Sequence, residues 1–154
     1  MFASALGSAG CAARLPPEAG VVPPEVRVRS TAGTFDTSAY QGKPVVLEFW
    51  ATTCEFCRAL APRMQQVHQQ VAAQGGSVLG LTMQEDSMDR ARMIARGHGM
   101  EFPIALAPQE LIDAFSVRAV PFIVVIDRGG RVVRYFRGTP DDRELDEAIT
   151  RAAQ

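Results

Sequence analysis

Residues 45–58 read VVLEFWATTCEFCR, and this stretch decides the fold of the chain. It opens with a short, apolar run rich in β-branched residues, Val45 to Trp50, which is typical of a parallel strand buried on both faces. Two cysteines, Cys54 and Cys57, follow the run after three further residues. The stretch therefore predicts a buried strand that leads directly into a Cys-x-x-Cys pair.

A helix is expected to follow, from about Cys54 to Gln74. Its apolar residues recur at spacings of four, three and four, which is the stripe of an amphipathic helix: Leu60, Met64, Val67 and Val71. The glycine pair at 75–76 is a typical helix terminator. The two cysteines are thus expected at the junction between a strand and a helix.

The ranges on either side of this junction alternate between strand and helix patterns. Ser87 is a suitable N-cap for one helix, and either Asp141 or Asp142 for the last one. Strands are expected at 26–29, 34–35, 77–82, 104–106, 122–126 and 131–137, and helices at 87–98, 111–115 and 141–152. Alternating units predict an α/β fold, and the tight turn at 127–130 requires an antiparallel hairpin at the edge of a partly parallel, mixed sheet.

Composition narrows the classes of function. Hydrophobic residues make up 47% of the chain and charged residues 21%, with a formal net charge of −1, which is ordinary for a soluble globular domain. No basic excess is present to neutralise phosphates, so a nucleic-acid partner is not expected. No apolar run reaches the roughly 18 residues of a membrane span.

Residues 1–24 differ from the rest and are expected to be a disordered, linker or anchor segment ahead of one domain at 25–154. Four prolines between residues 16 and 24 favour an extended linker. Ser8-Ala9-Gly10-Cys11 resembles a bacterial lipoprotein cleavage box, although Ser8 stands where Leu is usual. Cys11 is therefore a candidate lipid anchor, and the alternative is an incidental cysteine in a disordered terminus.

The spacing of Cys54 and Cys57 points to redox chemistry. Two intervening residues on a first helical turn bring both sulfurs within bonding reach, and the helix N-terminus stabilises a thiolate on the first of them. Cys54 would attack a partner's disulfide and Cys57 would resolve the mixed disulfide. The alternatives are a zinc site, for which only the scattered Cys11, His68 and His98 remain as further ligands, and a structural disulfide.

At these residues a family resemblance is plain. The stretch from Phe49 to Arg58 resembles the active site of thioredoxins, and Val120-Pro121 resembles their loop with a cis-proline. The helix and strand expected between 83 and 107, and the lead-in from Gly42 to Leu47, resemble the extracytoplasmic TlpA/ResA-type reductases. The resemblance covers residues 25–150 and implies a thioredoxin fold with an extra N-terminal hairpin and a central helix–strand insertion.

The resemblance also assigns residues around the cysteines. It places Pro121 opposite Cys54, where a cis peptide bond shapes a groove and the Val120 backbone pairs with an extended client. Within the same stretch, Glu55 and Phe56 are expected beside the groove. Trp50 is also expected at this groove, packed beside the active site, with simple core packing as the alternative.

Glu48 lies in an otherwise apolar strand, six residues before Cys54. Thioredoxins carry a buried acid at the matching position, and burial raises the pKa of a carboxyl group. Glu48 could then accept the proton of Cys57 when that thiol attacks. The alternative is a glutamate at a strand edge that faces solvent.

Three positions depart from the family pattern. Thr53 stands where Trp usually precedes the first cysteine, Phe56 where Pro is common, and Leu60 where some of these reductases carry a glutamate. The negative charge of Glu55 beside Cys54 opposes thiolate formation and favours a reductant.

The resemblance implies a thiol–disulfide oxidoreductase that works outside the cytoplasm, in the periplasm. If Cys11 carries a lipid, the N-terminus would anchor the protein to the membrane. Its clients would be protein disulfides, such as the haem-binding cysteines of apocytochrome c or another oxidoreductase, and a membrane or thioredoxin-type donor would re-reduce it. No metal and no cofactor beyond the redox-active disulfide are expected. The alternatives are a thioredoxin-like metallochaperone or scaffold and a peroxiredoxin, whose Pro-x-x-x-Thr-x-x-Cys loop the chain lacks.

Overall fold

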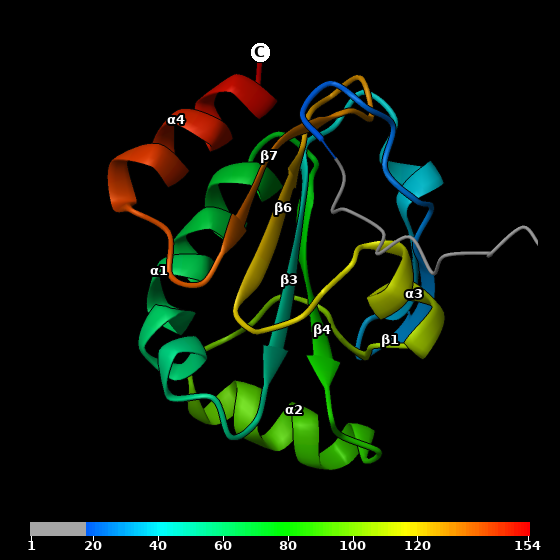
Figure 1. The fold of residues 1–154 in the computed structure, drawn as a ribbon, viewed down its shortest axis with the longest axis vertical. Helices are drawn as coiled ribbons and strands as arrows, with labels where there is room; N and C mark the ends of the chain where they lie inside the picture. The colour runs from blue at the N-terminus through cyan, green and yellow to red at the C-terminus, as the bar shows by residue number, and fades with distance from the viewer. Residues whose placement is uncertain (1–17) are drawn as a thin grey trace, which may run out of the picture.

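A computed structural model describes residues 18–154 and shows a single mixed sheet flanked by helices (Figure 1). Its seven strands lie in the order β2-β1-β5-β4-β3-β6-β7. The strands are β1 (Arg27–Ser30), β2 (Gly33–Asp36), β3 (Val45–Ala51), β4 (Ser77–Met83), β5 (Ile104–Leu106), β6 (Phe122–Ile126) and β7 (Val132–Arg137). The helices are the 3₁₀ turn η1 (Thr37–Tyr40), α1 (Glu55–Ala72), α2 (Met88–Gly97), α3 (Gln109–Ala114) and α4 (Asp142–Ala152).

Strand β3 is buried along its whole length, as its apolar sequence predicts. It pairs in parallel with β4 over seven residues and antiparallel with β6. With a strand on each side and side chains packed on each face, β3 has little freedom to shift. Its last residue, Ala51, therefore leaves the sheet at a well-defined place.

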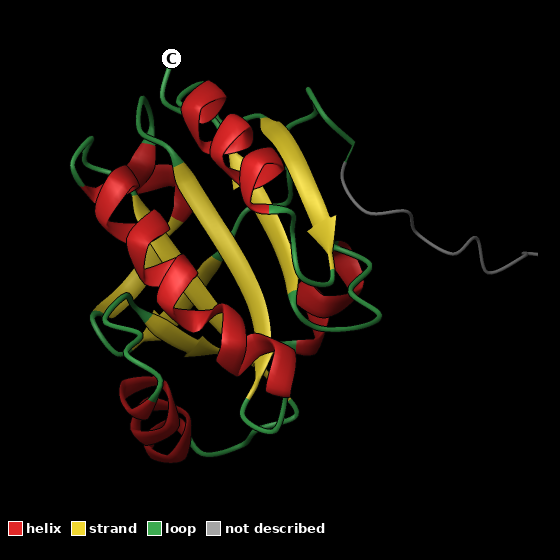
Figure 2. Ribbon diagram, turned by 90° about the vertical axis from the view of Figure 1, so that its left-hand side faces the viewer, coloured by secondary structure: helices red, strands yellow, loops and turns green. Residues whose placement is uncertain are grey.

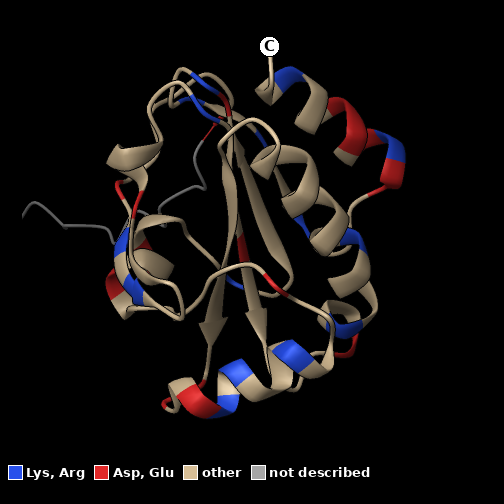
Figure 3. Cartoon of the chain, turned by 180° about the vertical axis from the view of Figure 1, so that it is seen from behind, with Lys and Arg blue, Asp and Glu red and all other residues tan. Residues whose placement is uncertain are grey.

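The two faces of the sheet are covered by different elements. Helices α1 and α4 lie across one face, as Figure 2 shows, and α2 contributes to the same core cluster. The core cluster on the other face combines side chains of the sheet, including those of β1 and β2, with the segment around α3. Charged residues lie on the helices and loops, and the central strands are nearly free of charge (Figure 3).

The expected architecture is confirmed, with a thioredoxin-like mixed sheet, an N-terminal β1–β2 hairpin and an inserted α2–β5 unit. One local expectation is wrong, and one short element was not predicted. The helix expected at 111–115 begins earlier, at Gln109. Its N-cap is Pro108, whose side chain makes no capping hydrogen bond, so the sequence carries no capping residue that marks this start. The 3₁₀ turn after β2 was not expected, and Asp36 caps it by accepting a hydrogen bond from the backbone N–H of Ser38.

None of the helices formed by residues 18–154 is both long and apolar enough to cross a membrane.

The turn between α1 and β4 brings two backbone segments into unusually close approach. A Cβ atom on Gly76 would lie 1.9 Å from the carbonyl oxygen of Pro44, the residue that leads into β3. Gly97, at the end of α2, has nothing within 4 Å of the same position. Gly76 therefore leaves no room for a side chain beside the Pro44 backbone, whereas Gly97 is in open space.

We expect Gly76→Ala to lower the free energy of unfolding by about 3 kcal/mol, since the Pro44 backbone must move and β3 with it. Gly97→Ala is the matched control and should raise stability by up to ~1 kcal/mol, because alanine is the better helix former. Urea unfolding of the two variants measures both effects. Equal stability of the two variants would show that the close approach at Gly76 is unimportant.

Candidate active site

Cys54 is the N-cap of α1, as the sequence predicts. The turn from β3 into the helix is closed by a hydrogen bond from the Cys54 N–H to the carbonyl oxygen of Ala51, 3.1 Å long. The backbone N–H of Cys57 points back at the Cys54 sulfur, with a nitrogen–sulfur distance of 3.2 Å. That N–H and the positive end of the 18-residue helix both favour negative charge on this sulfur.

Cys57 lies one helical turn further on and is bonded to Cys54 in a disulfide, with their Cα atoms 5.2 Å apart. The two cysteines differ sharply in exposure. Cys57 is 2% exposed, whereas Cys54 is half-buried and reaches the surface. Only Cys54 can therefore be approached by a large molecule, and Cys57 can act only on a sulfur already joined to Cys54.

The loop between α3 and β6 lies against this disulfide. The Val120–Pro121 peptide bond is cis, as expected. The carbonyl oxygen of Val120 lies 3.9 Å from the Cys54 sulfur. Val120 itself is half-buried and belongs to no strand, so an extended segment could pair with its backbone directly beside the reactive sulfur.

Glu48 is completely buried in β3, which rules out the alternative of a solvent-facing glutamate. Alternation along the strand puts its side chain on the same face as Val46 and Trp50, the face whose core cluster includes Cys57. Neither carboxyl oxygen has a hydrogen-bond partner among the described residues. Burial without a partner raises the pKa of Glu48 to about 8.

Trp50 is also completely buried, and the groove role expected for its side chain is corrected accordingly. Its indole packs edge-on against His98 at the end of α2, with ring centroids 6.4 Å apart. The expected alternative, core packing, is the one that this burial supports. The contact with His98 joins residues far apart in the sequence, so no local pattern could have revealed it.

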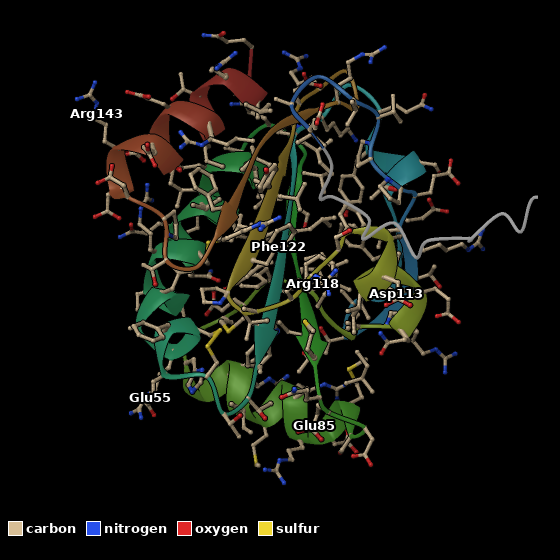
Figure 4. The ribbon with its side chains drawn as sticks, in the orientation of Figure 1. Glu55, Glu85, Asp113, Arg118, Phe122 and Arg143 are labelled. Carbon is tan, nitrogen blue, oxygen red and sulfur yellow. A yellow bond between two sulfur atoms is a disulfide. The ribbon has the colours of Figure 1, made fainter. Side chains whose placement is uncertain are left out.

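Glu55 and Phe56, between the two cysteines, both project into solvent. Phe56 is 70% exposed, which is unusual for an aromatic side chain without an apolar neighbour to cover it. Glu55 is drawn at the start of α1, pointing away from the body of the protein (Figure 4). These two side chains border the accessible sulfur, whereas Trp50 lies beneath it.

Glu85 lies in the loop between β4 and α2, and no sequence pattern predicted a role for it. Its side chain is only 7% exposed and forms an ion pair with Arg90 at 3.2 Å. It also accepts a hydrogen bond from the backbone N–H of Ser87, and the Thr52 hydroxyl lies 3.5 Å from its other oxygen. Glu85 therefore braces the loop that precedes Cys54 from the side of the insertion.

Two predictions concern features away from the disulfide. Cys11 lies outside the described residues, and its lipid attachment stays a prediction. Among residues 18–154, no group of three or more His, Cys, Asp or Glu side chains is placed to hold a metal ion.

The disulfide at the helix N-terminus, the cis-proline loop and the buried acid can be compared with known proteins. The sequence matches the profile of the AhpC/TSA family over residues 20–135, which is most of the chain. The chain belongs to the AhpC/TSA family. Within this family it resembles thioredoxin-fold oxidoreductases.

Named relatives and solved structures resemble this chain. The thiol-disulfide oxidoreductase ResA of Halalkalibacterium halodurans is 28% identical over 108 residues, which are 70% of this chain and 61% of that protein. ResA of Bacillus subtilis (strain 168) is 29% identical over 106 residues, 68% of this chain and 59% of that one. The chain thus spans about three fifths of the length of these two relatives.

Among solved structures, a DsbE-type thiol:disulfide interchange protein from Chlorobium tepidum superimposes with a TM-score of 0.80 at 25% identity, covering 90% of this chain and 99% of its own. A DsbF homologue from Corynebacterium diphtheriae gives a TM-score of 0.73 at 24% identity, with 87% and 85% covered. The second likeness shows the fold alone.

The buried carboxyl of Glu48 makes stability depend on pH. Its pKa of about 8 in the folded state lies above the ordinary value of 4.5, so the folded protein holds one more proton than the unfolded chain between these values. The stability contributed by this proton is complete below pH 4.5 and is lost as pH rises towards 8. From pH 5.5 to 7.5 the unfolding free energy should fall by about 2–3 kcal/mol on this account.

Urea unfolding of the oxidised protein at both pH values measures this fall, and Glu48→Gln, which cannot ionise, is the control. We expect the wild type to lose about 2–3 kcal/mol more than the variant between the two pH values. An identical pH dependence in both proteins would mean that Glu48 is ionised in the folded state at pH 5.5.

Proposed function

We propose that this chain is a thiol–disulfide oxidoreductase that reduces protein disulfides through Cys54 and Cys57. The observation that carries the proposal is the asymmetry of the pair, with an accessible sulfur at a helix N-terminus and its partner 2% exposed beneath it. A structural disulfide needs no such asymmetry. The names of the ResA relatives and of the Chlorobium tepidum protein support the same activity.

The reaction begins with the reduced pair. The Cys54 thiolate attacks one sulfur of a client disulfide, and the other client sulfur leaves as a thiolate. Cys57 then loses its proton and attacks the Cys54 sulfur, which releases the second client thiolate and forms the Cys54–Cys57 disulfide. The client gains two electrons, the protein loses two, and a thiol donor must return them.

Glu48 is proposed as the base that accepts the Cys57 proton. A pKa of about 8 is close to that of an ordinary thiol, so the transfer between the two groups costs little in either direction. A solvent-exposed carboxylate, with a pKa near 4, would be a much weaker base. Glu48→Gln should therefore slow the resolving step specifically.

Clients, donor and location are proposed on the resemblance to the ResA and DsbE proteins. The clients are protein disulfides, such as the haem-binding cysteines of apocytochrome c, and the donor is a membrane or thioredoxin-type reductase. The protein is proposed to work outside the cytoplasm, where disulfides form and persist. Export of the tagged full-length gene product tests the location, and strict retention in the cytosol would contradict it.

The activity is tested by reduction of insulin disulfides with dithiothreitol as donor. The wild type should accelerate the reaction, and Cys54→Ser should reduce it to the uncatalysed rate because no nucleophile remains at the surface. Cys57→Ser should instead accumulate a mixed disulfide between Cys54 and insulin, since nothing resolves it. Full activity in Cys54→Ser would exclude the proposed mechanism.

The direction of the reaction is tested by the reduction potential of the pair, measured with Cys11 changed to Ser so that a single couple titrates. We expect a value near that of thioredoxin, about −270 mV, because Glu55 disfavours the thiolate and so favours the disulfide state. A value near that of DsbA, about −120 mV, would make the protein an oxidant and the reductase direction wrong.

A further inference from the structure

The surface around Cys54 carries an uneven distribution of charge. On the loop between α3 and β6, Arg118 is exposed, lies two residues before Val120, and makes no ion pair or side-chain hydrogen bond within residues 18–154. Figure 4 shows Arg118 on this loop, on the opposite side of the disulfide from Glu55. The loop segment from Val117 to Phe122 holds no other charged residue.

The α1 side of the disulfide is different, because it carries both signs. Glu55 and Arg58 are both exposed on the first turn of α1. Phe56, which is 70% exposed, lies between them in sequence and offers an apolar contact that does not depend on charge. A segment crossing the site therefore meets one loop whose single charge is positive and, on the other side of the disulfide, a helix turn with charges of both signs.

We infer that Arg118 selects protein clients that carry an acidic residue two positions from the reacting cysteine. This inference rests on the proposed function and names the class of client. A client strand whose cysteine meets Cys54 pairs with the Val120 backbone, 3.9 Å from that sulfur. Since Arg118 lies two residues along the same loop, the client residue it faces lies about two residues from the client cysteine.

The arrangement also orients the client. A segment with an acid on one side of its cysteine and a base on the other can place the acid at Arg118 in one direction only. In the reverse direction its base would face Arg118 and be repelled. The geometry thus distinguishes two client sequences of identical composition and net charge.

Two blocked heptapeptides test this inference, each with a central cysteine held as a disulfide with 2-mercaptoethanol. One has glutamate two residues before the cysteine and lysine two residues after it, and the other has the reverse order. Both compete for the full chain carrying Cys11→Ser and Cys57→Ser, in which only Cys54 reacts and no second cysteine resolves the product. The Cys54 thiolate attacks the peptide sulfur, mercaptoethanol leaves as a thiolate, and mass spectrometry counts the two protein–peptide disulfides, one peptide being deuterated.

We expect one order to be preferred about threefold to tenfold at low salt, the range for an attraction replaced by a repulsion at an exposed site. Arg118→Lys should keep the preference, Arg118→Gln should abolish it, and Arg118→Glu should invert it. The preference should vanish in 1 M NaCl because exposed charges are then screened. Arg143→Glu, a control on α4 at the far end of the molecule (Figure 4), should leave it unchanged.

Equal trapping of the two peptides by the Arg118 protein at low salt would overturn the inference, as would a preference that survives Arg118→Glu. Either result leaves the proposed function standing, because both peptides are still trapped. If neither peptide is trapped and insulin is not reduced by the wild type, the proposed function itself fails.

Discussion

The site depends on one constraint, the anchoring of β3 in the middle of the sheet. Because β3 pairs with β4 on one side and with β6 on the other, its end delivers Cys54 to a position that neither neighbour can shift alone. The turn closed by the Cys54 N–H then starts α1, and the first turn of α1 buries Cys57. Strand β6 begins just after the Val120–Pro121 bond, so the pairing of β3 with β6 also sets the distance between the Cys54 sulfur and the cis-proline loop.

The same burial that anchors β3 shapes the chemistry beneath the sulfurs. An ionised carboxylate without partners in this core would cost several kcal/mol, so the folded protein keeps Glu48 protonated between about pH 4.5 and 8, where an ordinary glutamate is charged. A stabilising partner for Glu48 would lower its pKa and weaken it as a base. The cost in stability and the proposed role in proton transfer therefore have the same physical origin.

Much of this arrangement could be predicted from the sequence, because its signals are local. The apolar runs of β3 and β6, the stripe of α1 and the caps at Ser87 and Asp141 each lie within one element. The burial of Glu48 was expected from its apolar neighbours in β3 together with the resemblance to thioredoxins, with a solvent-facing glutamate as the alternative.

What the sequence could not reveal depends on contacts between distant segments. The sequence offered core packing of Trp50 but not its contact with His98, the C-cap of α2. The bracing of the Thr52 loop by Glu85 joins residues 33 positions apart, and neither has a neighbour that marks it as unusual. The early start of α3 was missed because Pro108 provides no hydrogen-bonding side chain at the cap.

The first described residues lie at the end of the sheet opposite the disulfide. The backbone N–H of Gly20 bonds to the carbonyl oxygen of Val132, and the Arg131 guanidinium bonds to that of Gly20, beside the β6–β7 turn. Figure 1 shows this segment near the C-terminus, whereas the C-terminal end of β3, which leads to the cysteines, lies at the other end of the sheet. Any attachment of the chain before Gly20 would therefore lie at the end of the sheet opposite the disulfide. The Cys54 sulfur would face away from the point of attachment and stay accessible to other proteins.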